Sequence, residues 1–255
     1  MPGFQITDVC VLSNNRHVST LNGIYLSLHD PETMFTLRTI KFDDPDTRLM
    51  CLARDDQDHI YVSQLKDGDI LEFDSELNFL RNLDGLGDVF PVGLDWREDN
   101  LYVCDEHDKR ILILKTGDGE NLNRNPKSFA LLIKPIAIKI FNDNVFVNGL
   151  TEMGTYVTHI YNLKDWSLKS KYENGPATFS ILGSYLVELS DNNEISFYTS
   201  DGDMFLRKQK ILSSNYNNRL PKFETRRLVS HFDNGIMNVT IFSSNASFFK
   251  FRYSN

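Results

Sequence analysis

The chain has 255 residues, a net charge of −8 at pH 7 and 12% aromatic residues. This acidic balance argues against general nucleic-acid binding, DNA included, because such proteins carry a basic footprint. The 14 Gly and 8 Pro residues exclude a collagen-like or low-complexity chain.

No apolar run reaches the roughly 18 residues of a membrane-spanning helix, and the first 13 residues lack the regions of a signal peptide. We therefore expect no membrane partner. The three cysteines, Cys10, Cys51 and Cys104, are odd in number and far apart, which favours reduced core thiols over a disulfide framework or a zinc site. The expected location is cytoplasmic or nuclear.

Short apolar segments separated by turn residues recur along the chain. They are rich in β-branched and aromatic residues and too short for helices, so they predict strands. In chain order they are 7–12, 17–21, 24–28 and 35–42; 49–53, 59–63, 70–73 and 79–83; 92–96, 101–104, 111–114 and 127–132; 136–141, 145–148, 156–161 and 168–172; 177–182, 185–189, 195–198 and 205–212; and 226–231, 236–242 and 248–253.

These segments form six copies of one unit. The second strands are centred on Val18, Tyr61, Tyr102, Phe146, Leu186 and Asn238, at spacings of 43, 41, 44, 40 and 52 residues, and a polar insertion at 213–222 accounts for the longest. Four antiparallel strands in about 42 residues are typical of a propeller blade.

The sequence therefore predicts an all-β fold, a six-bladed β-propeller of four-stranded antiparallel blades. We expect a single domain over 1–255, with blades at about 4–43, 44–88, 89–133, 134–174, 175–220 and 221–255. Two β-sandwiches of three meanders each are the alternative. The last copy lacks a fourth strand, and we expect Gly3 to Ile6 to supply it, because closure removes exposed strand edges.

The third copy carries a recognisable motif. Pro91-Val92-Gly93-Leu94-Asp95, then Asn100 to Asp105, then Lys109 to Leu114 resemble an NHL repeat. The second copy keeps Asp58 to Val62 and Asp69 to Asp74 but lacks the Pro-x-Gly start. NHL domains of the tripartite-motif and related families are six-bladed propellers that bind RNA or protein, so the resemblance implies the fold and one of these ligands.

Catalytic and metal signatures are absent from the sequence. The six histidines, His17, His29, His59, His107, His159 and His231, do not take equivalent positions, so we expect no axial metal and no cofactor. The acidic runs 55–58 and 191–194 favour solvated turns over calcium loops. Cys104 stands where other copies have Ser63, Asn148 and Glu188, which implies no nucleophile. The chain is predicted not to be an enzyme.

Recognition is expected on the face formed by the loops between second and third strands and by the connections between blades, because loops on a rigid scaffold usually carry it. Phe90 is either an exposed anchor or packed between blades. The candidate binding residues on this face are Lys66, Phe90, Asp105, His107, Lys109, Arg110, Glu152, Tyr216 and Arg219. We expect a protein or peptide partner; single-stranded RNA binding of the NHL type is the alternative, and a lyase- or lactonase-type metal enzyme a weaker one.

Overall fold

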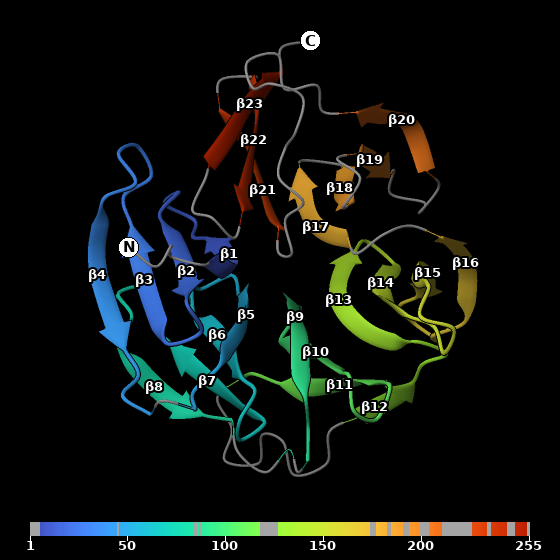
Figure 1. Cartoon of the computed structure of the whole chain (residues 1–255), viewed down its shortest axis with the longest axis horizontal. Helices are drawn as coiled ribbons and strands as arrows, with labels where there is room; N and C mark the ends of the chain where they lie inside the picture. The colour runs from blue at the N-terminus through green and yellow to red at the C-terminus, as the bar shows by residue number, and fades with distance from the viewer. Residues whose placement is uncertain are drawn as a thin grey trace. The chain divides into compact units, whose positions relative to one another are not determined.

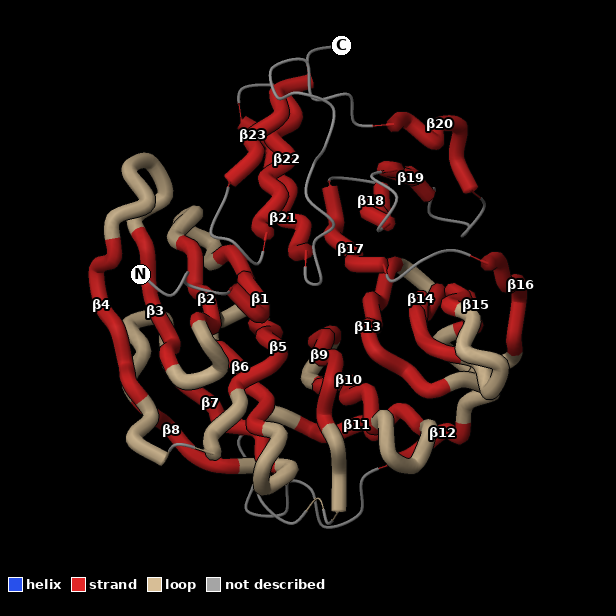
Figure 2. Tube along the Cα trace, in the orientation of Figure 1, coloured by secondary structure: helices blue, strands red, loops and turns tan. Residues whose placement is uncertain are grey.

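The computed structural model describes residues 6–44, 46–83, 86, 88–117, 127–173, 177–182, 185–190, 194–198, 204–210, 226–233, 236–243 and 248–253. Regular structure in these ranges consists of β-strands, without helix (Figures 1 and 2). None of the described segments is therefore a helix long and apolar enough to cross a membrane.

The described strands number 23 and pair antiparallel with their neighbours in sequence, in five sheets of four strands and one of three. The first sheet has β1 (Ile6–Val11), β2 (His17–Leu21), β3 (Tyr25–His29) and β4 (Thr36–Lys41), the second β5 (Leu49–Arg54), β6 (Ile60–Gln64), β7 (Asp69–Phe73) and β8 (Phe79–Asn82), and the third β9 (Pro91–Arg97), β10 (Asn100–Asp105), β11 (Arg110–Lys115) and β12 (Lys127–Ala130).

The later sheets repeat this order. The fourth has β13 (Lys134–Phe141), β14 (Asn144–Leu150), β15 (Tyr156–Asn162) and β16 (Leu168–Glu173), the fifth β17 (Ala177–Leu182), β18 (Tyr185–Ser190), β19 (Glu194–Tyr198) and β20 (Met204–Lys210), and the sixth β21 (Arg226–Asp233), β22 (Ile236–Ser243) and β23 (Phe248–Tyr253). All 23 predicted strands are confirmed, with ends shifted by at most two residues; positions 211 and 212 of the predicted strand 205–212 lie outside the described residues.

Turn chemistry explains why the strands end where they do. Asn15, Asp58, Asp99 and Asn142, which lie between first and second strands, have positive φ, a conformation that Asn and Asp tolerate better than most residues. Of the segment expected to close the last sheet, Gly3 to Gln5 lie outside the described residues. Ile6 pairs with Leu21 and so belongs to the first sheet.

The chain divides into two compact units. Phe4–Ile138, here the N-terminal unit, holds the first three sheets; Lys139–Asn255 with Met1–Gly3 is the C-terminal unit, and the boundary falls within β13. In the N-terminal unit the first strands β1, β5 and β9 are neighbours, as are β17 and β21 in the C-terminal unit. Neighbouring first strands are the arrangement that a propeller requires of successive blades.

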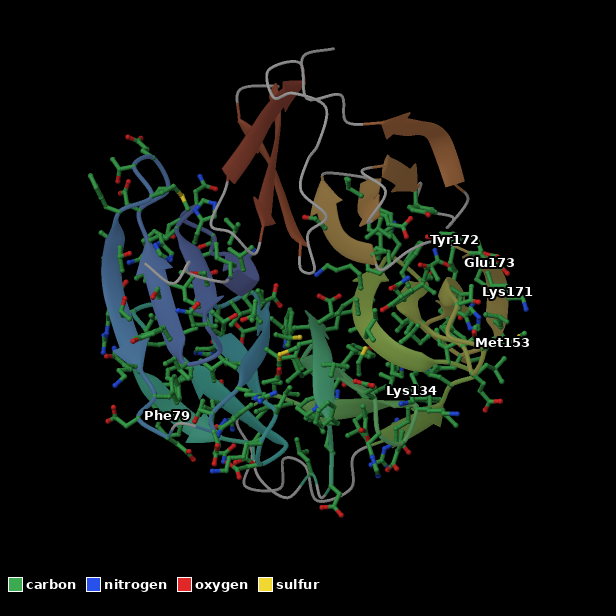
Figure 3. All side chains as sticks on the ribbon, viewed as in Figure 1. Phe79, Lys134, Met153, Lys171, Tyr172 and Glu173 are labelled. Carbon is green, nitrogen blue, oxygen red and sulfur yellow. The ribbon has the colours of Figure 1, made fainter. Side chains whose placement is uncertain are left out.

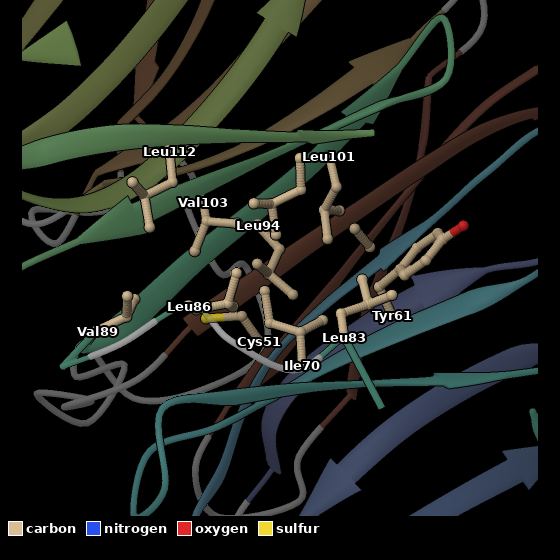
Figure 4. Packing of buried hydrophobic residues seen from close by; sticks show 12 residues of the cluster. Cys51, Tyr61, Ile70, Leu83, Leu86, Val89, Leu94, Leu101, Val103 and Leu112 are labelled. Atoms are coloured by element: carbon tan, nitrogen blue, oxygen red, sulfur yellow. The ribbon is translucent and has the colours of Figure 1, made fainter. Parts of the chain in front are cut away.

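Apolar side chains fill the space between successive sheets of the N-terminal unit. Cys51, Tyr61 and Ile70 of the second sheet pack with Leu94 and Val103 of the third (Figure 4). A second cluster joins Val18 and Leu26 of the first sheet to Ile60 and Val62 of the second. Each fully buried Leu, Ile or Val contributes about 1.5–3 kcal/mol, so these two clusters stabilise the contacts between successive sheets.

Gly93 on β9 is required by a close approach of the neighbouring strands. A Cβ at this position would lie 3.0 Å from Cys104 Sγ and 3.2 Å from both Ala137 Cα and Ile136 O. The two backbone atoms cannot move aside as the end of a flexible side chain would. The glycine of the Pro-x-Gly motif therefore serves packing.

We expect Gly93→Ala to lower the free energy of unfolding by about 1–3 kcal/mol, as overpacking of a filled core does. Gly117→Ala is the matched control, because a Cβ there meets nothing within 4 Å. Urea denaturation of the two variants and the wild type measures the difference. Equal stability of both variants would show that β9 can shift away from β13 at no cost.

Candidate interaction surface

The loops and connections at one end of the first three sheets are joined by backbone hydrogen bonds. Leu49 N donates to Gly23 O (2.7 Å) and Leu65 N to Arg48 O (3.0 Å), so the connection before β5 lies between the β2–β3 and β6–β7 loops. Phe90 O accepts from Glu106 N (3.1 Å), which joins the connection before β9 to the β10–β11 loop. We call this surface the loop face. It consists of the described residues among 22–24, 43–48, 65–68, 86–90, 106–109 and 131–134.

The β10–β11 loop is part of the loop face, and Asp105 organises this loop from inside. The side chain of Asp105 is fully buried. Its Oδ2 accepts from Arg110 Nε (2.8 Å) and its Oδ1 from Phe90 N (3.1 Å). Arg110 also pairs with Asp108 (2.9 Å). Asp105 and Arg110 therefore fix the shape of the loop, and His107 is left exposed near its tip.

Two exposed apolar side chains flank this loop. Phe90 keeps 41% of its surface and Leu132 keeps 74%. The backbone of Phe90 bonds the start of the loop at Glu106, and Leu131, next to Leu132, donates its N–H to Lys109 O at the end of the loop (2.7 Å). Phe90 is therefore exposed and not packed between blades, which were the two alternatives that the sequence left open. Leu132 was missed because it stands in the continuous apolar run 129–133, and only the structure shows that its neighbours Leu131 and Ile133 are buried.

Three basic side chains at the loop face, Lys66, Arg110 and Lys134, lie close to carboxylates. Lys66 Nζ lies 2.8 Å from Asp44 Oδ2 and 3.5 Å from Asp46 Oδ2. The hydrogen bond with Asp44 raises the pKa of Lys66, and the same bond lowers the pKa of Asp44. Lys134, labelled in Figure 3, lies 3.7 Å from Glu106. A ligand phosphate would compete with these carboxylates for each cation.

The other three predicted site residues come later in the sequence. Glu152 is exposed in the β14–β15 loop of the C-terminal unit, beside the exposed Met153 (Figure 3). Tyr216 and Arg219 lie outside the described residues. The structure thus brings together Phe90, Asp105, His107, Lys109 and Arg110, with Lys66 on another loop of the same unit.

Cys104 belongs to a set of buried polar residues near the ends of the second strands. The equivalent residues Thr20, Ser63, Asn148 and Glu188 are buried as well. Three of them satisfy backbone N–H groups: Thr20 accepts from Asp8 N (2.9 Å), Ser63 from Cys51 N (3.0 Å) and Asn148 from Ala177 N (3.1 Å). Burial raises the pKa of the Cys104 thiol, which keeps it protonated and poorly nucleophilic.

The acidic turn between β5 and β6 is solvated only in part, because Asp56 and Gln57 are exposed but Asp55 and Asp58 are buried. Asp58 is buried and accepts from Ser13 Oγ (2.5 Å) and Arg54 (2.7 Å). Burial opposes ionisation of Asp58, but the Ser13 hydrogen bonds and the Arg54 charge outweigh it and lower its pKa. Because Ser13 follows β1, the turn links the first sheet to the second.

Asp55 anchors a polar network within the second sheet that the sequence did not reveal. His59 Nδ1 lies 2.9 Å from Asp55 Oδ2, and the Tyr61 hydroxyl donates to the same oxygen (3.2 Å). Glu72, buried on β7, accepts from Arg81 Nε (2.5 Å). Arg81 also donates to Thr116 O (2.8 Å), beyond the end of β11. The network therefore ties the second sheet to the third.

The histidines take the scattered positions expected of them, with two corrections. His59 lies one residue before β6, because Asp55 binds it in the turn, and His231 lies within β21, which extends further than predicted. His159 is on the third strand of its sheet as predicted, and burial lowers its pKa. Within the described ranges, no three His, Cys, Asp or Glu side chains gather as metal ligands would.

Neither protein-family models nor the sequences of curated proteins match this chain. Solved structures do. The RRP9 WD40 repeats have a TM-score of 0.64 and 14% identity, covering 97% of this chain and 80% of theirs. A chain of the mitotic checkpoint complex has a TM-score of 0.65 and 14% identity, covering 98% and 77%.

Virginiamycin B lyase from Staphylococcus aureus has a TM-score of 0.61 and 13% identity, covering 98% of this chain and 85% of its own. At these identities the likeness shows the fold alone. Together with the antiparallel four-stranded sheets, it establishes an all-β propeller fold. Because the neighbours include both an assembly component and an enzyme, the fold does not choose between these functions.

Proposed function

We propose that the chain is a non-catalytic interaction module, a single six-bladed propeller whose loop face binds a protein or peptide. The observation that carries this proposal is the pair Phe90 and Leu132, held on either side of the β10–β11 loop by backbone hydrogen bonds. Exposed apolar side chains on a rigid, polar-rimmed surface are typical of protein-binding sites. The resemblance of the third blade to an NHL repeat agrees with such a role.

The RNA-binding alternative has less support on the described surface. NHL-type RNA binding would use Lys and Arg toward phosphates and aromatic side chains for stacking. Lys66 and Arg110 are each held between two carboxylates, which offset the charge that a phosphate would need. Phe90 is the exposed aromatic residue among the described parts of the loop face. The metal-enzyme alternative finds no ligand set among the described residues.

Site-specific photocrosslinking tests the proposal. A photoreactive amino acid at position 90 or 132 of the full chain, activated in living cells, is expected to give discrete adducts that are sensitive to protease and resistant to nuclease. Phe35 is the matched control position: it is 74% exposed, as Leu132 is, but follows β3 at the end opposite the β2–β3 loop.

The outcomes separate the candidate functions. Adducts at 90 and 132 that are absent at 35 support a protein-binding loop face. Nuclease-sensitive adducts would favour the RNA-binding alternative. Equal labelling at all three positions, or none at 90 and 132, would contradict the proposal.

A further inference from the structure

The loop face carries more acidic than basic side chains. Its described residues, extended to Asp105 and Arg110 at the ends of the β10–β11 loop, include eight carboxylates and five basic groups. The acidic residues are Asp43, Asp44, Asp46, Asp67, Asp88, Asp105, Glu106 and Asp108, and the basic ones are Arg48, Lys66, Lys109, Arg110 and Lys134. A polyanion would meet net repulsion here, and a cationic ligand net attraction.

Two of the acidic side chains are highly accessible. Asp43 keeps 94% of its side-chain surface and Asp46 keeps 74%. By contrast, Arg110 lies mostly covered between Asp105 and Asp108. Asp43 lies 3.5 Å from Lys41 and Asp46 lies 3.5 Å from Lys66, but both carboxylates keep most of their surface in water and can still meet a cationic ligand.

We infer that the loop face binds an extended peptide segment of a partner protein that combines Lys or Arg residues with large apolar ones. The apolar residues would cover Phe90 and Leu132, and the basic residues would pair with the acidic rim around Asp43 and Asp46. This inference rests on the proposed function and names its partner class. It follows from charge complementarity together with an apolar pair that the fold leaves exposed.

Selection from a phage-displayed library of random 12-residue peptides tests the partner class, with the full chain as bait. Sequencing is expected to show enrichment of peptides with Lys or Arg beside Leu, Met or aromatic residues. Synthetic versions should bind the Phe90→Ser/Leu132→Ser variant at least tenfold more weakly, because these side chains are the apolar anchors.

Charge is tested separately with Asp43→Asn/Asp46→Asn, which should weaken the same peptides about two- to fivefold, as expected for exposed ion pairs. Added salt should weaken wild-type binding in the same direction. Phe35→Ser is the control and should leave affinity unchanged. Melting curves confirm that each variant is folded before its affinity is measured.

The failures of the inference and of the proposed function are distinguishable. Enriched peptides that are acidic or uncharged, yet depend on Phe90 and Leu132, would overturn the basic partner class while the proposed function stands. No enrichment, or enrichment independent of both side chains, would overturn both. Tighter binding of a labelled 12-nucleotide RNA than of any peptide would replace them with the RNA-binding alternative.

Discussion

Replacing Arg81 by methionine is expected to lower the free energy of unfolding by about 3 kcal/mol, one of the two largest effects we predict for a single substitution. The guanidinium Nε lies 2.5 Å from Glu72 Oε2, and Glu72 is buried on β7. Removing one partner of a buried ion pair leaves the other charge without compensation, which typically costs about 3–5 kcal/mol. Because Arg81 is itself partly exposed, the lower end applies.

Arg81→Met should also weaken the contact between the second and third sheets. Arg81 also donates to Thr116 O (2.8 Å), while the Thr116 hydroxyl accepts from Trp96 Nε1 (2.9 Å). Methionine keeps most of the aliphatic bulk of Arg81 but cannot donate a hydrogen bond to Glu72 or to Thr116. We therefore expect the loss of stability to extend to the third sheet, seen as faster hydrogen exchange in β11 as well as in β8.

Lys41→Met is the matched control for this experiment. Its ion pair with Asp43, at 3.5 Å, is exposed on both sides. Exposed pairs contribute about 0–1 kcal/mol, so urea denaturation should barely distinguish this variant from the wild type. A combined Glu72→Gln/Arg81→Met variant should recover part of the loss, because the buried charge is gone. If Arg81→Met alone were as stable as the wild type, the buried ion pair would not be a stabilising link.

The strands could be predicted from the sequence because each short apolar segment is long enough for a strand but not for a helix. Segments such as 101–104 are too short for a helix and are bounded by Asp and Asn, which favour turns. Leu132 could not be found in this way, because it stands in the continuous apolar run 129–133, where the sequence shows no period-two alternation. Only the structure shows that Leu131 and Ile133 are buried and that Leu132 between them is exposed.

The roles of charged residues could not be predicted, because burial of a charge depends on contacts far apart in sequence. Asp58 lies in an acidic turn of ordinary appearance, and Ser13 of the first sheet, which is far away in sequence, encloses it together with Arg54. Asp105 likewise begins a charged loop that the sequence suggests is solvated, whereas Phe90 and Arg110 enclose it. In both cases the residue that pairs with the carboxylate decides whether the carboxylate can contact a ligand or only stabilises the fold.

Arg110 offers the clearest test of that distinction, because the sequence placed it among the binding residues and the structure gives it a supporting contact. We expect Arg110→Met to lower the free energy of unfolding by about 3 kcal/mol, since Asp105 would remain fully buried without its guanidinium partner. The β10–β11 loop should lose order at the same time, because Asp105 also holds Phe90 N.

His107→Ala changes the exposed tip of the same loop without touching this pair, so its stability should stay within about 0.5 kcal/mol of the wild type. Urea denaturation of both variants, with peptide affinity measured in parallel, separates the two roles. Arg110→Met should lower both the stability and the peptide affinity. His107→Ala should lower the peptide affinity and leave the stability unchanged. Adding Asp105→Asn to Arg110→Met should restore part of the stability, because the unpaired carboxylate is removed. An Arg110→Met variant with wild-type stability and lost affinity would instead make Arg110 a direct contact, as its sequence position first suggested.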